Sequence, residues 1–196
     1  MRYMIRLGMI SALLMLSGQP MAQSLQGEAL VEALRSGGHV IVMRHASSPR
    51  ELPDAASVNA DNINGERQLD EQGRADAIAL GEALTELDIP VSEVMSSPTY
   101  RALQTARLAG FEEVVEQAEL GNEGMRESGE QYSAWLKEQV TDAPADGNRL
   151  LITHAPNVNA AFPEHADGME EGEALIFDPD EQAPVARVTI AQWPLL

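Results

Sequence analysis

VIVMRHA, residues 40–46, places four consecutive apolar residues directly before an arginine and a histidine. Gly38 precedes this apolar run, and a polar loop over residues 47–68 follows it. An uninterrupted apolar run of this length, bounded by glycine and polar residues, is typical of a strand buried on both faces of a sheet. Such strands occur mainly in parallel sheets that helices cover on both sides. The segment therefore predicts an α/β fold.

Helix and strand patterns alternate along the rest of the chain. Further strands are expected at Val91–Met95, Val114–Val115, Leu150–Ile152, Ala174–Phe177 and Val185–Trp193. Helices are expected from a cap at Ser24 to Gly37, from a cap at Asp70 to near Pro90, and over Thr99–Ala109 and Tyr132–Val140. This order predicts a three-layer α/β/α sandwich around a mainly parallel central sheet. No linker divides it, so residues 25–196 are expected to form a single domain.

The first 24 residues have the features of a secretory signal peptide. Arg2 and Arg6 give a positive start, residues 7–16 are a short apolar run, and small residues over 17–24 offer cleavage after Ala22 or Ser24. The run is too short to span a bilayer comfortably, although a retained membrane anchor is the alternative. We therefore expect a periplasmic or secreted protein with no stable membrane anchor after cleavage. Removing Arg2 and Arg6 takes the net charge from −18 to −20.

Composition excludes several classes of function. A net charge of −18 over 196 residues argues against binding to nucleic acid, because phosphate backbones are bound by basic surfaces. The absence of cysteine excludes disulfides, thiolate metal sites and a thiol nucleophile. The four histidines show no metal-binding spacing, and we expect neither a metal nor another cofactor. Any anion site must therefore be built locally from the few arginines.

Polar residues with catalytic potential come directly after three of the apolar runs. Arg44-His45 follows the first, the segment 96–101 follows the second and ends at Arg101, and Thr153-His154 follows the third. Ligands of α/β sheets bind at the carboxyl ends of the strands, so these side chains are expected at one edge. A neutral imidazole can attack phosphorus, and arginine forks bind phosphoryl oxygens. The constellation indicates phosphoryl transfer.

The same segments resemble the motifs of the histidine phosphatase superfamily, which has the phosphoglycerate mutase-like fold. The resemblance runs in order from residue 38 to 160 and rests on VIVMRHA (40–46), RQLDEQGR (67–74), SSPTYRALQTA (96–106) and LITHAPN (151–157). It implies that His45 is the nucleophile that becomes phosphohistidine, and that Arg44, Arg101 and His154 bind the phosphate. Ala46 and Ala155 stand where the family usually has glycine, but neither change removes a reacting group.

The proton donor is harder to assign. The family usually draws an acid from the segment between its second and third motifs, which here offers Glu119, Glu123 and Glu127. Glu123, in the glycine-flanked turn 121–124, is our first choice, and Glu127 is the alternative. Other candidates are assigned to structure: 170–173 (EEGE) is expected to be a solvated turn, while His39 and His165 are expected to be structural or solvated. Asn157, Ser47, Ser48 and Arg50 are left as possible substrate contacts.

The resemblance and the signal peptide together predict an exported, metal-independent phosphomonoesterase. Its substrate would be a small phosphorylated molecule, either a sugar phosphate or a phosphomonoester of the cell envelope. Short segments between the motifs, together with export, disfavour a mutase, and export also disfavours a cytosolic phosphohistidine protein as substrate. The alternative is a catalytically inactive envelope protein of the same fold that binds a phosphorylated ligand. The oligomeric state is left open.

Overall fold

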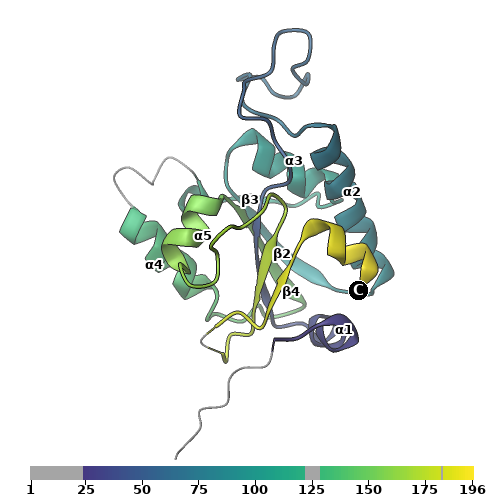
Figure 1. Cartoon of the computed structure of the whole chain (residues 1–196), viewed down its shortest axis with the longest axis vertical. Helices are drawn as coiled ribbons and strands as arrows, with labels where there is room; N and C mark the ends of the chain where they lie inside the picture. The colour runs from purple at the N-terminus through teal and green to yellow at the C-terminus, as the bar shows by residue number, and fades with distance from the viewer. Residues whose placement is uncertain (1–23, 122–128, 182) are drawn as a thin grey trace, which may run out of the picture.

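The computed structural model describes residues 24–121, 129–181 and 183–196 (Figure 1). Its centre is a six-stranded sheet in the order β3-β2-β4-β1-β5-β6. The pairs β1–β4, β2–β4 and β2–β3 are parallel, whereas β1–β5 and β5–β6 are antiparallel. The strands are β1 (Val40–Arg44), β2 (Val91–Ser96), β3 (Val115–Glu116), β4 (Asn148–Thr153), β5 (Ala174–Phe177) and β6 (Ala186–Val188). The predicted mainly parallel sheet is confirmed.

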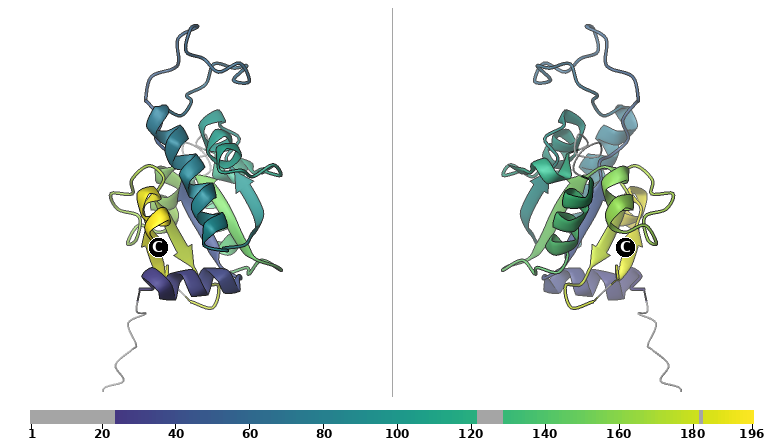
Figure 2. Two further views of the ribbon diagram at one scale, coloured as in Figure 1. Left: turned by 90° about the vertical axis from the view of Figure 1, so that its right-hand side faces the viewer. Right: turned by 90° about the vertical axis from the view of Figure 1, so that its left-hand side faces the viewer.

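Helices cover both faces of this sheet (Figure 2). One face carries α1 (Gly27–Ser36), α2 (Glu71–Glu86), α3 (Tyr100–Leu108) and η3 (Ile190–Leu195), and the other carries α4 (Gly129–Gln139) and α5 (Ala155–Ala161); a short 3₁₀ turn, η1 (Ala118–Leu120), precedes α4. Successive residues of β1 serve the two faces in turn: Ile41 packs with the first set of helices and Val42 with the second. Because helices cover both faces, both sets of alternating β1 residues are buried, and residues 40–43 of the strand are all apolar. The predicted three layers are confirmed.

Two predicted boundaries are wrong for identifiable reasons. Ser24 does not cap α1, because the Leu25 amide donates to the Val185 carbonyl at 2.7 Å and keeps this segment extended as far as Gln26. The predicted strand 185–193 ends at Val188. There the Thr189 side chain and Gln192 form a reciprocal capping box that starts η3.

The carboxyl edge of the sheet is where the chain leaves β1, β2 and β4. Asp70 caps α2 as predicted, since its side chain accepts from the Gly73 amide at 2.7 Å. The loop between β1 and α2 projects beyond the helices at the top of Figure 1. None of the helices in the described ranges is both long and apolar enough to cross a bilayer.

Close packing between α2 and α3 gives a first prediction. Gly81 lies against the Ala109 backbone, and a Cβ there would overlap the Ala109 carbonyl oxygen. Gly→Ala inside a helix normally stabilises by about 1 kcal/mol. We expect Gly81→Ala to do the opposite and to lower the free energy of unfolding by about 1–3 kcal/mol, because overpacking forces the helices apart. Urea unfolding measures this.

The neighbouring exposed residue Glu82 supplies the control. Glu82→Ala should change the free energy of unfolding by less than about 0.5 kcal/mol, as surface substitutions usually do. A stabilised Gly81→Ala variant would contradict the packing described for α2 and α3.

Candidate active site

Two histidines meet at the carboxyl edge because β1 and β4 run parallel and in register. Arg44 pairs with Thr153 at the ends of these strands, so His45 and His154 are the next residues on neighbouring strands. The His45 amide donates to the Thr153 carbonyl at 3.0 Å and extends the pairing by one residue. The two imidazole rings lie edge to face with centroids 5.2 Å apart.

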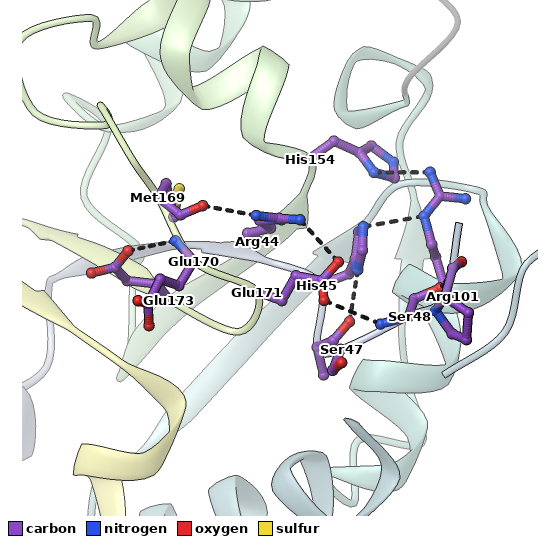
Figure 3. A network of polar contacts seen from close by, with 12 residues as sticks. Arg44, His45, Ser47, Ser48, Arg101, His154, Met169, Glu170, Glu171 and Glu173 are labelled. Carbon is purple, nitrogen blue, oxygen red and sulfur yellow. Dashed lines mark hydrogen bonds and ion pairs between the residues drawn. The ribbon is translucent and has the colours of Figure 1, made fainter. Parts of the chain in front are cut away.

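Arg101, in the first turn of α3, joins both rings (Figure 3). Its Nε donates to Nε2 of His45 at 3.1 Å, and its Nη2 donates to Nδ1 of His154 at 3.1 Å. The side chain is buried, so the guanidinium is presented to the pocket in a fixed position. An arginine can only donate, and therefore both of these ring nitrogens act as acceptors.

The opposite nitrogen of each ring has an acceptor for its proton. Nδ1 of His45 lies 2.8 Å from the Ala46 carbonyl oxygen, to which it donates. Nε2 of His154 lies 2.9 Å from Oγ of Ser97 and is assigned the remaining proton. The His45 tautomer that satisfies these partners therefore keeps an unprotonated Nε2, which is the form that can attack phosphorus.

Burial keeps both imidazoles neutral. It lowers the pKa of His45 from 6.5 to about 3, with a further contribution from the positive charge of Arg101. It lowers the pKa of His154 from 6.5 to about 2, again with Arg101 as the next cause. Burial and the charge of Arg67 also lower the pKa of Arg101 to about 10, which leaves its guanidinium protonated at neutral pH. Two neutral imidazoles and a charged guanidinium therefore lie together in the site.

These groups line a cavity of about 320 Å³. Arg44 lies beside His45, with Nη1 donating to the Met169 carbonyl at 2.8 Å and Nη2 paired with Glu171 at 2.9 Å. Arg67 donates to the Ser48 and Pro49 carbonyls and so holds the loop that follows β1. The complete lining is Arg44, His45, Arg50, Arg67, Arg101, His154, Ala155, Pro156 and Glu171. Four arginines and two neutral imidazoles make it an anion pocket.

A family model for the histidine phosphatase superfamily, branch 1, matches residues 40–177. The chain belongs to this superfamily. No curated protein matches it. Among solved structures, it is similar to the protein histidine phosphatase SixA in complex with tungstate, with 18% identity, a TM-score of 0.51, and 76% of this chain and 92% of that chain covered. It is also similar to TTHB049 from Thermus thermophilus, with 18% identity, a TM-score of 0.53, and 77% and 99% of the two chains covered.

The structure brings together four of the five predicted site residues of this superfamily member. Arg44, His45, Arg101 and His154 line one cavity, although they come from three separate segments. Glu123, the predicted proton donor, and the alternative Glu127 lie outside the described residues. Glu119 is described, and its carboxylate accepts from the Gln117 side chain and does not line the cavity.

Asn157 is not among the residues that line the cavity. Its side-chain amide donates to the Leu120 carbonyl at 3.1 Å and the Gly121 carbonyl at 2.8 Å, and so holds the end of η1 against α5. His39 is structural, as expected: it is buried, and its Nδ1 lies 3.0 Å from the Gly37 carbonyl oxygen.

The prediction that 170–173 is a solvated turn is wrong for two of its glutamates. Glu171 lines the cavity, and Glu173 is buried and paired with Arg187 at 2.6 Å. The residues that follow the apolar runs are not the only ones that reach this edge of the sheet. Because β5 runs antiparallel to β1, its amino end lies at the carboxyl end of β1, and the residues that precede β5 reach the same edge. An antiparallel assignment for β5 would have been the necessary signal.

The lowered pKa of His45 gives a second prediction. An unfolded histidine titrates near 6.5, so between that value and about 3 the unfolded chain binds more protons than the folded chain. The free energy of unfolding should therefore fall as the pH is lowered through this window. His45→Gln should flatten the fall by on the order of 1 kcal/mol per pH unit. Chemical unfolding at several pH values between about 7 and 4.5 measures both slopes; parallel curves for the two proteins would contradict the assignment of a buried neutral ring.

Proposed function

We propose that this histidine phosphatase hydrolyses phosphate monoesters through a phosphohistidine formed on His45. The observation that carries the proposal is the unprotonated Nε2 of His45, turned toward Arg101 in an arginine-lined cavity. Nδ1 is tied to the Ala46 carbonyl at 2.8 Å, which fixes the ring in the tautomer that attack requires.

Binding of the phosphoryl group rearranges the donors around this nitrogen. Arg101 now donates to two neutral imidazoles, one on each side. A phosphoryl oxygen carries negative charge and is a stronger acceptor, so it takes these hydrogen bonds and frees the lone pair of His45. The P–N bond then forms as the P–O bond to the alcohol breaks, the departing oxygen takes up a proton, and the guanidinium groups of Arg101 and Arg44 stabilise the charge on the phosphoryl oxygens.

Water completes the turnover. It attacks the phosphorus of the phosphohistidine, the P–N bond breaks, and inorganic phosphate leaves. The arginines supply the positive charge that stabilises both transition states, so the proposal includes no metal and no other cofactor. We infer hydrolysis over mutase activity because the segments between the motifs are short, and we propose a sugar phosphate or envelope phosphomonoester as substrate. The SixA structure, which is similar in fold, is a complex with tungstate, an oxyanion, and this is consistent with the proposal.

His45→Ala provides the third prediction. The protein from residue 25 onward should hydrolyse 4-nitrophenyl phosphate without added metal, and brief reaction with radiolabelled phosphoryl donor should leave acid-labile, base-stable phosphate on His45. The substitution should abolish both the turnover and the label. A colorimetric assay and acid or alkaline treatment of the labelled protein give the two readouts.

Two controls separate the alternatives. EDTA should leave the activity unchanged, and inhibition by EDTA would contradict the metal-free mechanism. The competing hypothesis, an inactive phosphate-binding protein, predicts that the unsubstituted protein binds tungstate but turns over no ester. Full activity in His45→Ala would show that another group is the nucleophile.

We also propose export, on the strength of the positively charged start, the short apolar run and the small residues within the first 24 positions. As a fourth prediction, residues 1–24 fused to a reporter that works only outside the cytoplasm should activate it. The processed protein should begin near Gln23 or Leu25, as read by amino-terminal mass spectrometry. Substituting Arg2 and Arg6 together by Glu is the matched control, because it removes the positive start. Full-length protein recovered from the cytosol would contradict export.

A further inference from the structure

We propose that Glu171 is the general acid of this site, giving a proton to the leaving oxygen and taking one from the attacking water. The proposal rests on the phosphatase function proposed above and assigns a role that the known motifs of the chain leave unfilled. It places the acid before β5, instead of in the segment between the second and third motifs.

The Glu171 carboxylate belongs to the pocket. Its Oε1 lies 2.9 Å from Nη2 of Arg44, and its Oε2 accepts from the Ser48 amide at 3.4 Å. Figure 3 shows the carboxylate between these two groups. Its charge also acts on the guanidinium of Arg101. Among the described residues, it is the carboxylate that lines the cavity with the nucleophile.

Backbone hydrogen bonds fix Glu171 to the strand that carries the nucleophile. On one side, the Gly172 amide donates to the His45 carbonyl at 2.9 Å. On the other, the Arg44 amide donates to the Glu173 carbonyl at 3.0 Å. These two bonds continue the pairing of β1 with β5 and hold the peptide of Glu171 at a set distance from His45. Its position does not depend on a flexible surface loop.

The rest of the turn is equally constrained. The buried Glu173 carboxylate accepts from the Glu170 amide at 2.8 Å and pairs with Arg187. The hydrogen bond joins the two ends of the turn 170–173 and holds its shape. Gly172 has a φ of +76°, and a Cβ there would lie 2.8 Å from the Ile190 side chain. A residue other than glycine would be both strained and crowded. Preorganisation of this kind is typical of catalytic elements.

Substrate binding supplies the conditions for proton transfer. In the structure, Arg44 and the Ser48 amide both donate to the Glu171 carboxylate. A bound phosphoryl dianion would compete for both donors. Glu171 then shares its cation with the bound phosphoryl group and, in this assignment, supplies the proton that goes to the leaving oxygen.

The reaction has two steps, and Glu171 moves a proton in each. Nε2 of His45 forms a bond to phosphorus, the P–O bond to the leaving group breaks, and the Glu171 proton goes to the departing oxygen, which leaves as an alcohol. Water then attacks phosphorus and gives a proton to the Glu171 carboxylate. The P–N bond breaks, its electron pair returns to His45, and phosphate leaves. Ester plus water gives alcohol plus phosphate, and both side chains are restored.

A leaving-group series on Glu171→Gln tests the assignment, and it is the fifth prediction. Hydrolysis of β-glycerol phosphate, whose alkoxide is a poor leaving group, should slow by on the order of 10²- to 10⁴-fold. Hydrolysis of 4-nitrophenyl phosphate should slow less than about tenfold, because nitrophenolate leaves without a proton. Tungstate should bind Glu171→Gln at least as tightly as it binds the unsubstituted protein, since a competing negative charge beside Arg44 is gone.

Glu170→Gln is the matched control, because it makes the same change one residue away on an exposed side chain. It should behave like the unsubstituted protein with both esters. Glu123→Gln is the competing variant. A selective loss of β-glycerol phosphate hydrolysis in that variant instead of Glu171→Gln would overturn the proposal, as would an equal loss of both activities, or no loss, in Glu171→Gln.

Two further results keep the test decisive. If thermal unfolding shows that Glu171→Gln does not fold, Glu171→Asp retains the acid but withdraws it by one methylene, and should lose the alkyl ester selectively; an unselective loss would overturn the assignment. An unsubstituted protein that hydrolyses neither ester and forms no phosphohistidine would instead overturn the proposed function. An active protein with an unselective Glu171→Gln would overturn the role of Glu171 alone.

Discussion

The hydrogen bond from the His45 amide to the Thr153 carbonyl, 3.0 Å long, extends the parallel pairing of β1 and β4 to His45 and His154. It places two imidazoles side by side at the end of the sheet, at the spacing that a single guanidinium can bridge. Arg101 then fixes the acceptor nitrogen of each ring, and burial keeps both rings neutral. A change in strand register would undo the tautomer, the neutral state and the anion pocket together.

The pocket collects positive charge in a chain whose net charge is −18. Four arginines of the chain line this cavity, and backbone carbonyls orient two of them. Arg44 donates to the Met169 carbonyl, and Arg67 donates to the Ser48 and Pro49 carbonyls. The acidic surface repels a phosphate ester at long range, but at physiological salt this repulsion fades over about 8 Å. Within the cavity the short hydrogen bonds of the guanidinium groups decide binding, so local geometry outweighs net charge.

The antiparallel strand β5 completes the edge. Parallel strands deliver the residues that follow them, whereas an antiparallel neighbour delivers the residues that precede it, and the turn 169–173 reaches the site by this route. Arg44 connects the residues that follow β1 with those that precede β5. Its amide donates to the Glu173 carbonyl, and its side chain donates to the Met169 carbonyl and the Glu171 carboxylate. A mixed sheet therefore brings a carboxylate to a site that a purely parallel arrangement of the same strands would have lined with other residues.

The sequence by itself determined the layers, most of the strands and the group Arg44, His45, Arg101 and His154, because apolar runs mark buried strands and the residues after them share one edge. It did not determine the direction of β5, the end of β6 or the place of Glu171. These depend on contacts between residues far apart in the chain: Val40 with Phe177, and Gly172 with His45. A run such as EEGE has the composition of a solvated turn whether or not its backbone pairs with β1. Only the tertiary structure decides between the two, through hydrogen bonds that local pattern does not encode.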